Sequence, residues 1–158
     1  MRLAFFKGRH PGWKGLFGVL VKWWTRGDFS HVELVVEDRG TNGICWSSTF
    51  LDHGVRKMVV DFAPGDWVFV DLPTTPEQNA AALEWFEEHA GEAYDVRGLF
   101  GFVLRRIPGE KGKWFCSESV AAALGVEEPW RFDPATFYRV VTNWCEMVRH
   151  HAAPVETV

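Results

Sequence analysis

The sequence predicts an α+β domain in which a small antiparallel sheet packs against helices. Most strand patterns lie before residue 73, and helical patterns dominate from Thr75 onward. The chain has 158 residues, of which 47% are hydrophobic, so it is long enough to bury one core. Because no repeat or linker divides the sequence, we expect a single domain over 1–151 and a loose tail over 152–158.

The clearest strand pattern covers residues 30–37, where apolar side chains recur at every second position. We expect that apolar face to be buried. The opposite face carries an imidazole and a carboxylate two residues apart, from His31 and Glu33. The face predicted to be buried consists of Val32, Leu34 and Val36.

Other short apolar runs bounded by turn residues predict the remaining strands. The simplest arrangement is a meander, in which each strand pairs with the next along the chain. The predicted strands cover 3–6, 44–49, 55–60 and 67–72, with a last one over 144–149.

The best-defined helix start is Thr75, because Pro76 follows it and Gln78 stands three residues later. This helix is expected to reach Ala90, with its core stripe on Leu83, Phe86 and Ala90. Spacing predicts that the helix over 13–25 also packs against the core. Further helices are predicted over 96–106, 116–124 and 133–141.

Cys116 begins the Ala-rich helix that Gly125 closes. Unpaired N–H groups and the helix dipole favour an anion at such a position, and thiols there tend to become nucleophilic thiolates. A buried, inert cysteine is the alternative, and we assign that role to Cys45 and Cys145. A nucleophilic Cys116 needs a base, and the strand face with His31 is the natural place for it.

Composition argues against several classes of function. The formal net charge of −4 gives no basic surplus for binding a nucleic-acid backbone. Three cysteines without a C-x-x-C pair predict no disulfide framework, and no histidine pair has the spacing of a metal motif. We therefore expect no metal and no cofactor.

The apolar stretch over 16–24 is too short to span a bilayer and lacks the pattern of a signal peptide. We expect no stable membrane insertion and a cytoplasmic protein, for which lysis or association with a particle would be the way out of the cell. A membrane-surface protein would instead need the aromatic face over 13–24 to be exposed.

Three groups of residues occur in a characteristic order: Ser30-His31-Val32-Glu33-Leu34, then Gly91-Glu92-Ala93-Tyr94-Asp95 with Gly98-Leu99-Phe100-Gly101-Phe102, then Phe115-Cys116-Ser117-Glu118. With these motifs the sequence resembles the circularly permuted NlpC/P60 hydrolases, and more closely the YiiX/YaeF-like group of papain-fold cysteine hydrolases. In that group the catalytic histidine precedes the cysteine. The resemblance implies a papain-like fold, with a small antiparallel sheet or half-barrel and the cysteine helix packed on it.

The resemblance also implies roles for single residues: Cys116 as nucleophile and His31 as general base. In the family a third polar residue lies on the strand after the histidine strand, which here offers Ser47, Ser48 or Thr49 and no carboxylate. Glu33 is chemically a better orienting group, but residues i and i+2 of a strand lie roughly 6–7 Å apart. Its alternatives are binding of a substrate amine and an ion pair at the rim of the cleft.

Tyr94 matches a family position near the cysteine, where its hydroxyl would donate to an oxyanion or to substrate. The alternative is a tyrosine of the core. The backbone N–H of Cys116 is a second expected oxyanion donor. We expect Glu118 to cap its own helix and Asp95 to cap the helix that follows it.

The implied activity is that of a cysteine hydrolase, an amidase or peptidase acting on a peptide or cell-wall-type amide. Relatives in the group act on lipid acyl chains, so a lipid acyl ester or amide hydrolase or an acyltransferase remains an alternative. A catalytically inactive papain-like binding module is the other one, because the sequence offers no clear third member of a triad.

Overall fold

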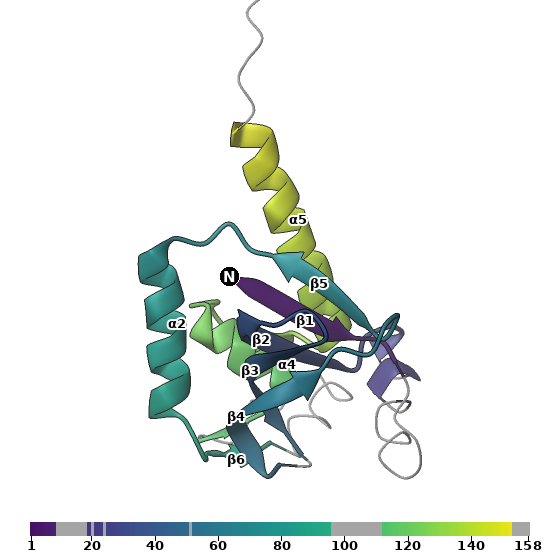
Figure 1. The fold of residues 1–158 in the computed structure, drawn as a ribbon, viewed down its shortest axis with the longest axis vertical. Coiled ribbons are helices and arrows are strands. Elements are labelled where there is room, and N and C mark those ends of the chain that lie inside the picture. Colours follow the sequence, from purple (N-terminus) through teal and green to yellow (C-terminus); the bar gives the residue numbers. More distant parts are fainter. Residues whose placement is uncertain (9–18, 20, 24, 51, 96–111, 153–158) are drawn as a thin grey trace, which may run out of the picture.

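A five-stranded antiparallel sheet forms the centre of a mixed α+β fold (Figure 1). The computed structural model describes residues 1–8, 19, 21–23, 25–50, 52–95 and 112–152. In space the strands follow the order β4-β3-β2-β1-β5. Their bounds are β1 (Arg2–Phe6), β2 (His31–Asp38), β3 (Asn42–Thr49), β4 (Gly54–Asp61) and β5 (Trp67–Asp71).

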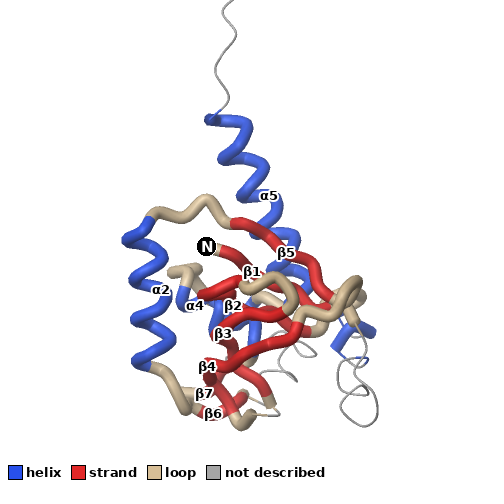
Figure 2. The backbone as a smooth tube through the Cα atoms, in the orientation of Figure 1, coloured by secondary structure: helices blue, strands red, loops and turns tan. Residues whose placement is uncertain are grey.

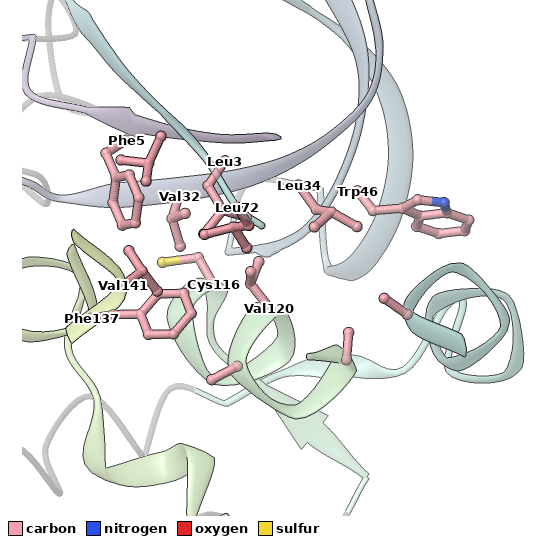
Figure 3. Close-up of a cluster of buried hydrophobic side chains, with 14 of the residues drawn as sticks. Leu3, Phe5, Val32, Leu34, Trp46, Leu72, Cys116, Val120, Phe137 and Val141 are labelled. Atoms are coloured by element: carbon pink, nitrogen blue, oxygen red, sulfur yellow. The ribbon is translucent and has the colours of Figure 1, made fainter. Parts of the chain in front are cut away.

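Helices cover one face of this sheet. Helix α4 (Cys116–Ala123) packs against β2 and β3, with α5 (Pro134–Ala152) on one side of it and α2 (Pro76–Glu88) on the other (Figures 2 and 3). A short parallel pair, β6 (Ala93–Tyr94) and β7 (Lys113–Trp114), lies beside β4 and leads into α4. A 3₁₀ turn, η1 (Pro129–Arg131), connects α4 to α5.

The two faces of the sheet bury different side chains. The main core lies between the sheet and the helices, and a smaller cluster of Ala4, Val35, Cys45 and Phe62 lies on the other face. The main core includes Leu3, Phe5, Val32, Leu34, Trp46, Phe86, Val120 and Phe137.

The last predicted strand pairing is wrong. Strand β5 does not extend the meander beside β4, but pairs antiparallel with β1 at the opposite edge of the sheet. Phe62, which follows β4, nevertheless touches Phe69 of β5, with ring centroids 5.0 Å apart. The sheet therefore curls so that its two edges approach each other at this end.

The predicted alternation along β2 holds only as far as Val35. A β-bulge between Val35 and Glu37 shifts the register against β3, so Val36 is exposed although we expected it to be buried. Before the bulge both faces of β2 are covered: Val32 and Leu34 face the main core, while Glu33 and Val35 are buried on the other side.

The predicted start of α2 is confirmed. The Thr75 hydroxyl accepts a hydrogen bond from the Gln78 N–H at 3.3 Å, and the Gln78 side chain accepts one from the Thr75 N–H at 2.9 Å. Phe86 is buried and Leu83 half-buried, as expected. Ala90 lies beyond the end of the helix and is exposed, so the predicted stripe was one turn too long.

Helix α5 continues where the sequence predicted a strand over 144–149. Asp133 caps it through hydrogen bonds of 2.9 Å from the Ala135 and Thr136 N–H groups to its carboxylate. Its buried side chains follow a helical four-residue spacing that carries on through the predicted strand. These side chains are Phe137, Val141 and Cys145.

Two predicted helices fall largely on residues outside those described. Of the helix over 13–25, residues Val19, 21–23 and Thr25 are helical. Val19 and Trp23 are 46% and 69% exposed, so these two do not pack against the core as expected. The helix over 96–106 lies outside the described residues. Of the tail predicted over 152–158, Ala152 is the last residue of α5 and the rest lies outside the described residues. Within the described part of the chain, no helix combines the length and apolar character needed to cross a membrane.

Candidate active site

The candidate nucleophile is the first residue of α4, as the sequence predicted. Phe115 is extended, with φ −97° and ψ 171°, and its N–H donates to the Glu118 carboxylate at 3.4 Å, which confirms the expected cap. At the other end, Gly125 takes a left-handed conformation with φ +73°. Cys116 therefore lies among the unpaired N–H groups of the first helical turn.

The Cys116 side chain extends from α4 toward the sheet. Figure 3 shows its sulfur near Val32 of β2 and near Phe137 and Val141 of α5. Only 4% of Cys116 is exposed. The surroundings of the sulfur are thus apolar on this side, and the polar partner comes from the beginning of β2.

That partner is His31, the first residue of β2. Its Nε2 is hydrogen bonded to Oε1 of Glu33 at 2.7 Å. Burial lowers the pKa of His31, but the charges of Cys116 and Glu33 and hydrogen bonding to both outweigh burial and raise it to about 9. A protonated imidazole is therefore favoured next to Cys116 at neutral pH. Because Cys116 contributes to the raised pKa of His31, the fold places these two side chains close together.

Glu33 orients the His31 ring although the two residues are only two positions apart. Their backbone spacing suggested a separation too long for contact, but the side chains bridge it. Glu33 is only 1% exposed, so it lies at no cleft rim. Burial raises the pKa of Glu33, but hydrogen bonds from Arg56 and the charge of His31 outweigh burial and lower it to about 2. Glu33 is thus a carboxylate throughout the neutral range.

Arg56 of β4 was not identified from the sequence. It donates from Nη1 to Glu33 Oε2 at 2.7 Å and from Nη2 to Glu33 Oε1 at 2.5 Å. Arg56 also donates from Nε to Asp52 at 3.2 Å. The sequence gives only a weak signal for this ion pair. Whether a basic residue reaches an acidic one two strands away depends on the register between the strands.

The two serines on β3, Ser47 and Ser48, donate hydrogen bonds to main-chain carbonyls. The Ser47 hydroxyl donates to the Val32 carbonyl at 2.7 Å, and the Ser48 hydroxyl donates to the Trp114 carbonyl at 2.6 Å. Both side chains are fully buried. Their hydroxyl hydrogens are therefore engaged within the fold, and the structure shows the His31 ring bonded to Glu33 instead.

Tyr94 lies in the electrostatic neighbourhood of Cys116. It is the last residue of β6 and pairs with Trp114, two residues before the cysteine. Burial and then the charge of Cys116 raise the pKa of Tyr94 well above its usual value, with smaller contributions from Asp95 and Glu118. Its hydroxyl therefore keeps its proton and is available as a donor.

Two buried carboxylates lie close to the same helix start. Burial raises the pKa of Glu118 to about 7; the hydrogen bond from Phe115 opposes this rise and the charge of Asp95 adds to it. Asp95 is fully buried. The helix that we expected Asp95 to cap lies outside the described residues. In the described ranges, no group of three or more His, Cys, Asp and Glu residues could hold a metal ion.

The ionisation of Glu33 predicts a pH-dependent contribution to stability. Its pKa is lower in the folded protein than in the unfolded chain, so its contribution is complete above about pH 4.5 and disappears as the pH falls toward 2. Glu33→Gln removes the buried carboxylate that pairs with Arg56 and leaves it only the more exposed Asp52, so we expect the free energy of unfolding to fall by about 3 kcal/mol at pH 6. Urea unfolding at several pH values should show this difference shrinking toward pH 2.5.

Glu37→Gln is the control for this measurement. Glu37 lies on the same strand and pairs with Arg39, but it is exposed. This variant should unfold almost like the original protein at every pH. A deficit for Glu33→Gln that stays constant between pH 6 and pH 2.5 would mean that Glu33 is not ionised in the folded protein.

Comparison with models of known protein families finds no match, and comparison with curated protein sequences finds none either. The three ordered motifs and the geometry of the site are therefore the basis for inferring a function.

Proposed function

We propose that this protein is a cysteine hydrolase of the permuted papain-like type, an amidase or peptidase that forms an acyl-enzyme on Cys116. The arrangement of His31 carries the proposal. Its Nε2 is bonded to Glu33, which leaves Nδ1 as the ring nitrogen available to the thiol. A nucleophile, a base and a group that orients the base are the components that acyl transfer through cysteine requires.

In the proposed reaction the Cys116 thiolate attacks the carbonyl carbon of an amide, forming a C–S bond as negative charge develops on the oxygen. The C–N bond then breaks, and protonated His31 gives its proton to the leaving amine. Water attacks the resulting thioester and passes a proton to His31. The C–S bond breaks, the carboxylic acid leaves, and the cysteine–histidine pair is restored.

Two donors are candidates for stabilising the oxyanion. The backbone N–H of Cys116 belongs to the first turn of α4, where the helix dipole also favours negative charge. The Tyr94 hydroxyl is the second candidate, because it keeps its proton and interacts electrostatically with Cys116. Glu33 is not a candidate for binding a substrate amine, since both its oxygens accept hydrogen bonds within the protein.

The substrate that the motif resemblance implies is a peptide or a cell-wall-type amide. A lipid acyl ester or amide is the second candidate, because the group that the motifs resemble includes relatives that act on lipid acyl chains. Transfer of the acyl group to an amine instead of water would make the same site an acyltransferase. An inactive binding module is favoured by one observation, the 4% exposure of Cys116.

Alkylation of the three cysteines tests whether Cys116 is activated. We expect iodoacetamide at pH 7 to modify Cys116 at least tenfold faster than Cys45 and Cys145, because a thiolate reacts and a thiol does not. Burial raises the pKa of Cys45 to about 12 and also raises that of Cys145. Peptide mass spectrometry after timed quenching measures each rate in the intact protein. Equal rates at all three cysteines would support the inactive binding module and contradict the hydrolase.

A further inference from the structure

The guanidinium of Arg56 holds both oxygens of Glu33, the carboxylate that contacts His31. One Glu33 oxygen, Oε1, accepts from His31 Nε2 at 2.7 Å and from Arg56 Nη2 at 2.5 Å. The other, Oε2, accepts from Arg56 Nη1 at 2.7 Å. A two-point contact of this kind fixes the plane of the carboxylate as well as its position. The orientation of Glu33, and through it that of the His31 ring, therefore depends on Arg56.

The register of the sheet explains how Arg56 reaches a strand that it does not pair with. Arg56 is opposite Ser47 in the pairing of β4 with β3, and Glu33 lies on β2, on the other side of β3. The serine side chain is small and turns to the Val32 carbonyl. This leaves space for the arginine to cross β3 and meet Glu33. The Arg56 side chain is 14% exposed, which fits an ion pair that is largely shielded from water.

A second contact holds the arginine itself. Arg56 Nε donates to the Asp52 carboxylate at 3.2 Å, and Asp52 accepts a hydrogen bond from the Thr49 hydroxyl at 2.7 Å. The guanidinium is thus fixed on two sides. Because an arginine remains charged over the whole working range of pH, its effect on Glu33 is constant.

We propose that Arg56 is a positioning residue of the active site, which acts through Glu33 to hold the His31 ring in the orientation and protonation state that Cys116 needs. This rests on the proposed cysteine hydrolase. Arg56 itself touches no reacting atom. An exposed pair of this kind would contribute little, but the burial of Glu33 makes it depend on its charged partner.

The other charged and titratable groups around this pair come from several elements. Cys116 on α4 faces His31, and Asp52 faces Arg56. Cys45 on β3 interacts electrostatically with Glu33, and Asp52 does so as well. From β1, the residues opposite Glu33 and His31 are Ala4 and Phe6, which carry no charge. Within the described residues, the cationic side chains that donate hydrogen bonds to the Glu33 carboxylate are therefore Arg56 and protonated His31.

The test compares Arg56→Met, which removes the charge, with Arg56→Lys, which keeps it but cannot make the two-point contact. We expect the rate of Cys116 alkylation at pH 6.5 to fall about tenfold in Arg56→Met, with the midpoint of its pH profile rising by about one unit. Arg56→Lys should give an intermediate profile. Without Arg56 the buried Glu33 should take up a proton more easily and no longer support the charge of His31, so NMR titration of the His31 ring should show its pKa falling in the same order.

The matched control is Arg2→Lys, because Arg2 on β1 also makes a two-point contact, with Asp71 through bonds of 2.7 and 2.9 Å, but away from His31. It should leave the alkylation profile unchanged. If Arg56→Met does not fold, the alkylation profile and the His31 titration of Arg56→Lys test the proposal.

An unchanged profile and an unchanged His31 titration, in a folded variant, would overturn the proposal and leave Arg56 a purely structural residue. Failure of the hydrolase proposal is distinguishable, because it would appear as a Cys116 that is unreactive in the original protein. The titration of His31 would still report whether Arg56 acts on it.

Discussion

Alkylation of Cys116 at pH 7 is expected to slow about 10- to 100-fold when His31 is replaced by alanine, because an ordinary thiol is only a few per cent thiolate at this pH. In the original protein His31 lies next to Cys116, and its raised pKa of about 9 favours a protonated imidazole there at pH 7. Alanine removes that charge and also the hydrogen bond to Glu33. In the proposed hydrolase reaction the rate should fall by about 10²- to 10⁴-fold, because His31 is also the proposed proton donor for the leaving group.

His150→Ala is the control for this prediction, since His150 is exposed on the last turn of α5. Its alkylation rates should equal those of the original protein at all three cysteines. Circular dichroism of both variants checks that the fold is kept. A His31→Ala protein that is folded and alkylated at the original rate would show that His31 does not activate Cys116.

Among the glycines in the described part of the chain, Gly54 is expected to show the largest loss of stability when it is replaced by alanine. A Cβ at Gly54 would lie 1.9 Å from the carbonyl oxygen of Glu92, a backbone atom that cannot move aside alone. Gly54 also has φ +136°, which side chains rarely adopt. We expect the free energy of unfolding to fall by more than about 3 kcal/mol, measured by urea unfolding.

This close approach matters for the site because it joins β4 to the segment before β6, the strand that pairs with β7 just ahead of Cys116. The Val55 N–H donates to the Glu92 carbonyl at 2.9 Å, and the Gly91 N–H donates to the Val55 carbonyl at 2.9 Å. Strand β6 follows directly and carries Tyr94. Any Gly54→Ala protein that folds should therefore also show slower Cys116 alkylation.

Gly40→Ala separates the two causes of the loss. Gly40 also has a positive φ, +86°, but a Cβ there would meet nothing within 4 Å. This variant bears only the conformational cost and should lose about 1 kcal/mol. Equal losses for the two variants would mean that the backbone contact at Gly54 does not constrain the fold.

Local patterns predicted much of the secondary structure correctly. The Thr75 cap, the helix closed by Gly125 and the alternation at the start of β2 all depend on residues a few positions apart. The strand predicted over 144–149 is wrong, because the helical spacing of buried side chains from Phe137 through Cys145 continues into it as one helix. The bulge after Val35 also escaped prediction, because it arises from pairing with β3.

Local sequence patterns are enough to predict which groups could do chemistry: a cysteine at a helix start, and an imidazole and a carboxylate on the same side of one strand. These placements follow from the backbone geometry of single elements. The contacts that these groups make depend on how the elements pack together. In the folded protein His31 lies beside Cys116, and Ser47 and Ser48 donate hydrogen bonds to main-chain carbonyls. Arg56 reaches across β3 and binds Glu33. Those contacts depend on strand order, register and burial, which join residues far apart in the chain and leave no periodic pattern along it.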